Sequence, residues 1–330
     1  MKKKMLMTAL VLGTGTMMLA ASVQAATAEE ILEKYMEASQ NAAAFSADVD
    51  MNLAIGLGIT KEGVSMNMDM ALLGDLAMDY IKDPLSMQLD GSMSITIPGE
   101  EEESVALQLY MVPEEDGSLG CYAYADEGDG GEWEYTAVPA EQLEQVMTLI
   151  ASQELDITQL PGTLTLGQEG IEIDGTSCTE LKNTITYADL EPIISQALEA
   201  AAAEDSDAVA ELESSLSIVS MALDGLQLNS TILVADDTSL PMKVAIDFAG
   251  SDLSMLNQIL AYSFADTDDE GNAVFPEIAL DISNLYIQIS YNYDAPAEIT
   301  VPEEGLAAKA YGDTDTLTEA LEDAVDEIAG

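Results

Sequence analysis

The stretch Val64-Ser65-Met66-Asn67-Met68-Asp69-Met70 decides the fold of this chain, because it alternates apolar and polar side chains over seven positions. A period of two is typical of a β-strand that water wets on one face only. Three of the four apolar residues are methionine, although β-branched residues are the usual choice for strands. Methionine is flexible and polarizable, and it suits surfaces that fit irregular apolar partners. The stretch therefore indicates a sheet with one adaptable apolar face.

Similar segments follow one another on both sides of this stretch, separated by turn signals such as Lys61-Glu62-Gly63, Asp83-Pro84 and Pro98-Gly99. Because strands joined by short turns pair with their neighbours, we expect an antiparallel meander and not βαβ units. The strands expected in this first half are 45–59, 64–73, 77–81, 85–97, 105–111, 119–125 and 132–138.

Helices are expected before, between and after the strands. Residues 28–40 carry an apolar stripe of Ile31, Leu32, Tyr35 and Met36. Further helices are predicted at 139–153, 187–203, 205–219, 251–263 and 314–328, and further strands at 163–174, 176–187, 226–235, 240–248 and 278–293. No internal repeat or low-complexity linker divides the chain, which favours one elongated domain.

The N-terminus reads as a secretory signal peptide over residues 1–25. Three lysines precede an apolar run that ends in Val23-Gln24-Ala25, with small residues at the −3 and −1 positions of a cleavage site. A retained membrane anchor is the alternative. No cysteine lies near the junction, so no lipid anchor is expected, and no later apolar run approaches the ~18 residues of a membrane span. We therefore expect a secreted or cell-envelope-associated protein. The remaining chain is expected to form a main domain over 26–312 and an acidic helix over 313–330.

The mature chain is strongly acidic. Nine Lys and Arg residues less the three lysines of the leader leave 9 − 3 = 6 against 62 acids, a net charge of −56. Such a charge disfavours nucleic acid and anionic membranes as partners. The 48% hydrophobic content argues against disorder. A solvated acidic surface is the plain interpretation, with binding of divalent cations as the alternative.

The chain contains no histidine and no arginine. This excludes Ser-His-Asp and Cys-His catalysis, histidine-ligated zinc and bidentate arginine clamps. Carboxylate-pair chemistry stays open, but 62 acids will always supply some suggestive pair. No enzymatic activity and no cofactor are predicted.

Two further features leave alternatives open. Cys121 and Cys178 could form a disulfide in an exported chain, or remain two separate buried thiols. The segment 266–277 partly matches a calcium loop, although Pro276 would obstruct the helix that leaves such a loop. The acidic turn before a strand is the alternative for this segment, whose candidate ligands are Asp266, Asp268, Glu270 and Glu277.

The order of helix, meander, helical insert and second meander resembles the LolA/LppX/RseB-like lipoprotein-carrier superfamily, and within it a branch of secreted Gram-positive proteins. Three local matches carry the resemblance over roughly residues 28–310. They are the opening helix and strand (30–36 and 45–49), the turn-Leu-Pro-x-Lys strand start at 239–244, and the closing strand with its Pro-Glu-Glu end at 299–304. The resemblance implies an α+β fold: a strongly curved antiparallel sheet, or half-open barrel, with helices covering the concave side.

In characterised relatives the concave side holds acyl chains, so the resemblance favours a secreted, non-enzymatic carrier of a lipid or other apolar ligand. This chain departs from the pattern, since it lacks the lipidation cysteine of many relatives and any arginine to grip a lipid or partner. An envelope or sensor module with a filled core, binding another protein and no ligand, is the alternative. The candidate ligand-binding residues are Met66, Met68, Met70, Met87, Met93, Leu107, Leu109, Met111, Ile287 and Ile289.

Overall fold

The computed structural model describes residues 27–308 except 62, 100–101, 127, 129, 141–160, 193–219, 222, 268–272, 295 and 297. The predicted signal peptide, the helix at 205–219 and the acidic helix at 313–330 lie outside the described residues, as does nearly all of the helix predicted at 139–153. Residues 187–192, the start of another predicted helix, are helical.

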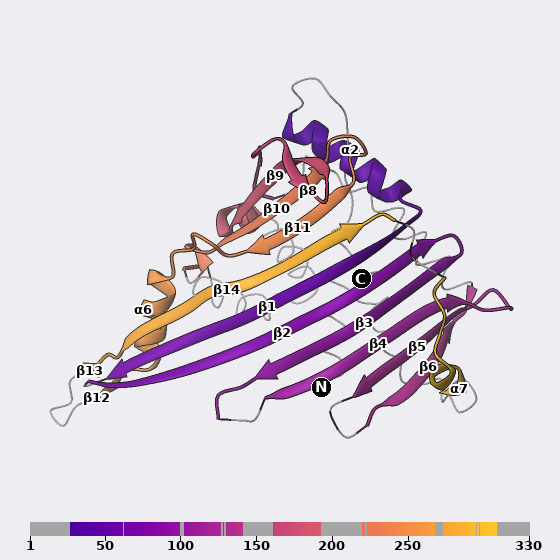
Figure 1. Cartoon of the computed structure of the whole chain (residues 1–330). Coiled ribbons are helices and arrows are strands. Elements are labelled where there is room, and N and C mark those ends of the chain that lie inside the picture. The colour runs from indigo at the N-terminus through magenta and orange to yellow at the C-terminus, as the bar shows by residue number, and fades with distance from the viewer. Residues whose placement is uncertain are drawn as a thin grey trace, which may run out of the picture.

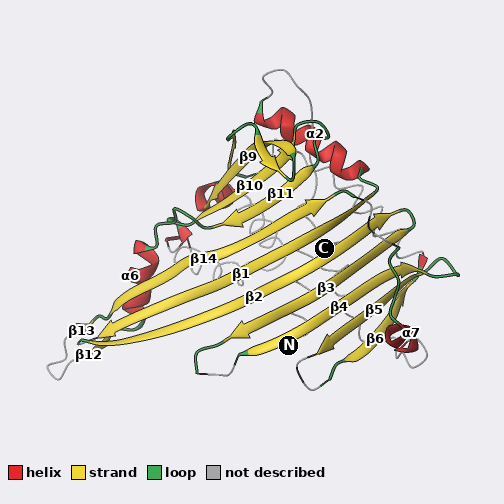
Figure 2. Cartoon of the chain, in the orientation of Figure 1, coloured by secondary structure: helices red, strands yellow, loops and turns green. Residues whose placement is uncertain are grey.

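One large antiparallel sheet forms the molecule (Figures 1 and 2). Its strand order is β6-β5-β4-β3-β2-β1-β14-β11-β10-β9-β7, with β8 paired to β9, and a two-stranded hairpin, β12-β13, stands apart. The strands are β1 (Ala44–Lys61), β2 (Val64–Lys82), β3 (Leu85–Thr96), β4 (Glu103–Pro113), β5 (Leu119–Asp126), β6 (Glu132–Val138), β7 (Thr163–Leu166), β8 (Ile171–Ile173), β9 (Thr176–Thr186), β10 (Gln227–Ala235), β11 (Pro241–Asp247), β12 (Asp266–Thr267), β13 (Ala273–Val274) and β14 (Glu277–Asn292).

The first six strands form the predicted meander, each paired to the next. Two predicted strands, 64–73 and 77–81, are wrong as separate elements, because β2 runs unbroken from Val64 to Lys82. Gly74 interrupts the apolar pattern without ending the strand. A Cβ there would lie 3.0 Å from the Cε atom of Met51 on the neighbouring strand, so the methionine fills the space that the glycine leaves. The Asp174-Gly175 turn between β8 and β9 is confirmed, with both residues at positive φ, as two-residue hairpins prefer.

Helices α2 and α6 flank the sheet. Helix α2 (Ala28–Asn41) starts at a capping box, in which Thr27 Oγ1 accepts from Glu30 N–H at 3.3 Å and a Glu30 carboxylate oxygen accepts from Thr27 N–H at 3.1 Å. Helix α6 (Ser254–Ser263) lies along β14, where the Asn257 side chain accepts from the Leu280 N–H at 2.9 Å. That bond pairs a backbone donor on a strand edge that would otherwise be open.

The two faces of the sheet differ in what covers them. We call the inner face the one that carries the largest hydrophobic cluster, which includes Ala47, Leu76, Met78, Leu89 and Val244. Helix α2 packs on this same side, where its Leu32 and Tyr35 contact Leu181 of β9 and Val234 of β10. The sheet is curved and not closed, so the fold is the expected half-open barrel with helical cover on its concave, inner side.

Within the part of the chain that the structure describes, the outer face is covered at one end. Tyr110 and Tyr122 are buried there against Ile299 and Val301, and helix α7 (Glu303–Ala308) follows this segment over β5 and β6 (Figure 1). The closing strand expected at 299–301 is wrong, because these residues have no strand pairing. Their apolar side chains are used to cover tyrosines on the face of the sheet, and not to extend its edge.

Candidate functional site

All ten candidate ligand-binding residues lie on the inner face. The register shows this directly, because residues that pair across antiparallel strands share a face. Met66, Met68 and Met70 pair with Ile59, Leu57 and Ile55 of β1. Ile287 and Ile289 pair with Met51 and Val49 on the other side of β1. Met93 pairs with Gly74 across β2–β3, and Leu107, Leu109 and Met111 pair with Gly91, Leu89 and Met87 across β3–β4.

Seven of the ten belong to the packed part of this face. Met93, Leu107 and Ile289 are buried, and Met87, Leu109 and Ile287 pack against the same cluster. Met111 is half-buried beside them. These side chains pack against neighbouring strands, as a hydrophobic core does, so most of the candidates have a structural role in the described fold.

The three methionines of the opening stretch lie elsewhere on the same face. Strands β1, β2 and β14 run past their neighbours, since β2 meets β3 only from Ala71 onward and β14 meets β11 only from Tyr286 onward. We call the projecting part, residues 55–61, 64–70 and 277–282, the extension. On it Met66 is 53% exposed and Met70 48%, while Met68 is half-buried. As formed by the described residues, the inner face is thus divided into a packed floor and an uncovered apolar end.

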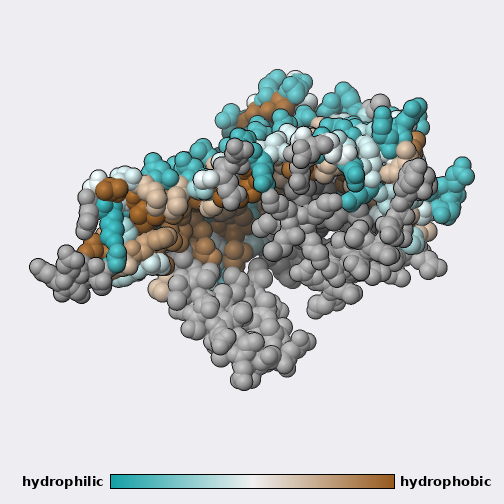
Figure 3. Space-filling model, turned by 90° about the horizontal axis from the view of Figure 1, so that it is seen from below, coloured by the Kyte–Doolittle hydropathy of each residue, from teal (hydrophilic) through white to brown (hydrophobic). Residues whose placement is uncertain are grey.

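The uncovered end also holds apolar residues that are not among the ten candidates. Val64 is 73% exposed and Ile95, which pairs with Leu72, is 39% exposed. Beside the extension, Tyr262 of α6 and Phe275 meet edge to face with ring centroids 4.9 Å apart, and both are exposed. Figure 3 shows hydrophobic residues along the underside of this end, below a largely hydrophilic opposite side. Ile95 could have been found from its alternation with Met93, whereas the aromatic pair follows only from the placing of α6.

The disulfide between Cys121 and Cys178 does not form in this structure, where both are buried free thiols. Their strands, β5 and β9, lie near opposite ends of the strand order. Burial raises the pKa of the Cys121 thiol to about 11. Burial, and then the charges of Asp236 and Asp237, raise the pKa of Cys178. The structure therefore has the second of the two alternatives, and both thiols are held neutral.

The calcium candidates are not assembled by the described residues. The Asp266 carboxylate lies 2.8 Å from the Lys61 ammonium, which joins β12 to the end of β1. Asp268 and Glu270 lie outside the described residues, and Glu277 begins β14. Within the described ranges, no group of three or more His, Cys, Asp or Glu side chains could hold a metal ion. In the same part of the chain, no helix is long and apolar enough to cross a membrane.

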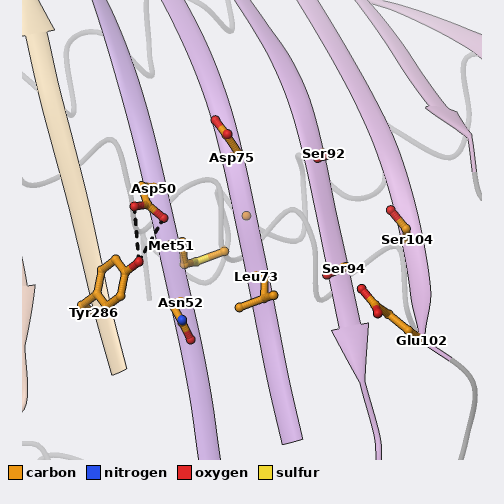
Figure 4. A pocket seen from close by; sticks show the side chains of 11 residues that line it. Asp50, Met51, Asn52, Leu73, Asp75, Ser92, Ser94, Glu102, Ser104 and Tyr286 are labelled. Atoms are coloured by element: carbon orange, nitrogen blue, oxygen red, sulfur yellow. Dashed lines mark hydrogen bonds between the residues drawn. The ribbon is translucent and has the colours of Figure 1, made fainter. Parts of the chain in front are cut away.

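A second feature, a polar depression of about 390 Å³, lies on the outer face. It spans β14, β1, β2, β3 and the start of β4, and its side chains come mostly from the positions that alternate with the inner set (Figure 4). The Tyr286 hydroxyl donates to the Asp50 carboxylate, at 3.4 Å from Oδ1 and 3.3 Å from Oδ2. The lining residues are Asp50, Met51, Asn52, Leu73, Gly74, Asp75, Ser92, Ser94, Glu102, Ser104 and Tyr286.

Comparison with known proteins gives one family match and several structural likenesses. Residues 27–161, less than half of the chain, match the model of a family of unknown function, DUF6612. No curated protein sequence matches the chain. Among solved structures, the chain is similar to the lipoprotein LppX of Mycobacterium tuberculosis, with 12% identity, 80% of this chain and 93% of that chain covered, and a TM-score of 0.31.

Two other solved structures are similar to the chain. LprF from Mycobacterium bovis shows 13% identity, with 81% of this chain and 93% of that chain covered and a TM-score of 0.31. An outer membrane lipoprotein-sorting protein domain from Vibrio parahaemolyticus shows 7% identity, with 77% and 87% covered and a TM-score of 0.17. At such TM-scores these likenesses carry no argument about function, which must rest on the chain's own geometry.

Proposed function

We propose that this chain is an exported, non-enzymatic protein that binds a lipid or another acyl-chain ligand on its inner face. One observation carries the proposal: the ten apolar residues share a single face, and that face continues from a packed floor onto an extension where Met66 and Met70 remain about half exposed. An apolar ligand lying along this face would meet a continuous apolar surface from the extension toward the core.

The chemistry of the exposed end suits a flexible apolar ligand. Methionine side chains have unbranched, rotatable stems, so the same three residues can fit chains of different shape. The outward residues that alternate with them, Ser65, Asn67 and Asp69, are polar and exposed. An extension with one apolar and one polar face keeps a single pairing register between its strands, because a slip of one residue would exchange the two faces.

The affinity would come from area and shape. Covering a large apolar side chain completely is worth about 1.5–3 kcal/mol. Because Met66 and Met70 have already lost about half of their exposure to water, each can add roughly 1 kcal/mol when a ligand covers it. A micromolar dissociation constant corresponds to about 8 kcal/mol, so a ligand must also engage several floor residues.

The test is to purify the mature protein from its native host under mild conditions and record native mass spectra before and after lipid extraction. We expect a co-purified lipid, and saturable binding of a fluorescent fatty acid. The double substitution Met66→Gln and Met70→Gln should weaken that binding about 30-fold, because two losses of roughly 1 kcal/mol add to about 2 kcal/mol. Leu73→Gln is the matched control, because Leu73 is an exposed apolar residue of the same strand on the opposite face.

The proposal would be refuted by the absence of any co-purified lipid together with no binding of the fluorescent fatty acid. That result would leave the alternative of a protein-interaction module with a filled core. Equal loss of binding in the Leu73→Gln control would also count against it, because the effect would then not belong to the inner face.

A further inference from the structure

The methionine sulfur atoms of the inner face differ in their access to water. Met66 and Met70 on the extension are 53% and 48% exposed, whereas Met78 and Met93 of the packed floor are each 6% exposed. An oxidant must reach a thioether sulfur to oxidise it, so susceptibility follows exposure. The four methionines therefore fall into an accessible pair and a protected pair.

The two thiols of the chain compete poorly for an oxidant. Cys121 and Cys178 are both buried, and burial raises the pKa of the Cys121 thiol to about 11. Burial also raises the pKa of Cys178. Because a thiol attacks an oxidant as its thiolate, both cysteines are held in the unreactive form near neutral pH. A thioether carries no proton, so its oxidation needs no general base, and a chain without histidine can still be modified in this way.

Met66 and Met70 lie where a change of polarity has the largest effect on the inner face. They pair with Ile59 and Ile55 of β1, so all four side chains share that face. The residues that alternate with the methionines along β2 are already polar and exposed. A sulfoxide is polar and chiral and replaces a flexible apolar group. Oxidation of the pair would therefore make this part of β2 largely polar on both faces.

We propose that Met66 and Met70 form a modification site, at which a peroxide converts the uncovered end of the inner face from apolar to polar and so releases the ligand. A lone pair of the sulfur attacks one oxygen of hydrogen peroxide, an S–O bond forms and the O–O bond breaks. The departing hydroxide takes the proton of the transferred oxygen and leaves as water. Sulfur is oxidised by two electrons and the peroxide is reduced by two. Release of the ligand rests on the proposed function, whereas the modification itself does not.

The modified protein should keep its fold and lose affinity. Both sulfoxides would lie at exposed positions, where water hydrogen-bonds to the new oxygens and the packed floor is unchanged. The affinity for the fatty acid should fall about 30-fold, as for Met66→Gln with Met70→Gln, because the same two half-exposed side chains become polar. Methionine sulfoxide reductases, one for each sulfoxide epimer, should restore it.

The test is to expose the full mature chain to graded hydrogen peroxide and to map the sulfoxides by peptide mass spectrometry. Met66→Leu with Met70→Leu is the test variant, because leucine is apolar and has no sulfur. Met221→Leu with Met255→Leu is the matched control, since these two methionines are 48% and 45% exposed in helical segments outside the sheet.

Each protein is compared with itself before and after oxidation by three measurements. Binding of the fluorescent fatty acid reports the ligand site, and retention on a hydrophobic-interaction column reports the apolar surface without any ligand. Circular dichroism reports the fold. Treatment of the oxidised chain with both sulfoxide reductases shows whether the changes reverse.

We expect Met66 and Met70 to be oxidised well before Met78 and Met93. The oxidised native chain and the oxidised control variant should bind the fatty acid about 30-fold more weakly and elute earlier from the column. The test variant should change little in either property, because its inner face has no accessible sulfur. The circular dichroism spectrum should stay native in all three proteins.

Three results would overturn the proposal. The first is oxidation of Met78 and Met93 as fast as that of Met66 and Met70. The second is an equal loss of column retention in the test variant, and the third is unchanged affinity of the fully oxidised native chain. If the native chain binds no fatty acid before oxidation, the proposed function and the release step fail together. The peptide masses and the column retention then still decide whether the modification site exists.

Discussion

The division of the inner face into a packed floor and an uncovered extension predicts that two methionines of one face respond differently to truncation. Met93 is 6% exposed and belongs to the main cluster, whereas Met66 is 53% exposed on the extension. Replacing a buried methionine by alanine costs about 2–5 kcal/mol, because both transfer energy and a cavity are lost. Met66→Ala leaves no cavity, and about half of the transfer energy is missing because the side chain is half exposed. We therefore expect this substitution to lower the free energy of unfolding by about 0.5–1 kcal/mol.

Urea unfolding measures the difference. For a slope of roughly 3 kcal/mol per molar urea, Met93→Ala should lower the midpoint by about 1 M and Met66→Ala by about 0.2–0.3 M. Trp133, the only tryptophan, reports the outer cluster by fluorescence, and circular dichroism reports the whole sheet. Coincident curves from the two probes justify the comparison.

The binding of a fluorescent fatty acid supplies the second half of the comparison. Met66→Ala should weaken it measurably at nearly native stability, and Met66→Leu, which conserves volume, should retain it. If Met66→Ala lowers the midpoint as much as Met93→Ala does, the extension is part of the packed core in solution. The inner face would then have no uncovered end, and the reasoning behind the ligand site would fail.

Three further predictions concern stability. Burial raises the pKa of the Cys121 thiol from 9.0 to about 11, so the neutral thiol stabilises the fold fully below pH 9, and this stabilisation is lost as the pH rises through 11. In Cys121→Ala the melting temperature should therefore fall less steeply between pH 9 and 11 than in the native chain, and a steeper fall would refute the assignment. Thr27→Ala removes the capping box of α2 and should cost about 1 kcal/mol in a urea titration, with Thr27→Ser nearly neutral; equal costs for the two would contradict the role of the hydroxyl. Gly175→Ala places a Cβ at a φ of 84° and should cost about 1 kcal/mol, whereas Gly175→Asn should cost less; the reverse order would contradict the turn.

The faces of the strands were predictable from the sequence because side-chain direction alternates locally. The stretch 64–70 and the alternations at 105–111 and 285–289 placed their apolar residues on one side before any pairing was known. The same local logic failed at Gly74, where the pattern lapses and the predicted strand ended too early. There the side chain of Met51 on the neighbouring strand fills the space beside Gly74, and the strand continues. A local sequence pattern cannot identify this partner.

The pairing order was not predictable in the same way. Strand β14 lies between β1 and β11, about 230 residues along the chain from the first of them, and this pairing creates the extension. The outer depression was missed for the same reason. Asp50, Asp75 and Ser92 are distant in sequence and unremarkable singly, and only the register of three strands makes them neighbours.

The apolar inner face and the polar depression lie on opposite faces of the same strands, and this permits a final test of the inner-face site. In β2, Leu73 belongs to the outer depression and Leu72 packs against the inner-face cluster, so neighbouring residues serve different surfaces. Because successive side chains of a strand point to opposite sides, a substitution on one face leaves the contacts of the other in place. Met66→Gln with Met70→Gln should therefore weaken fatty-acid binding, and Leu73→Gln should leave it unchanged. If Leu73→Gln also abolishes fatty-acid binding, substitutions in β2 act through the sheet as a whole, and the loss cannot be assigned to the two methionines.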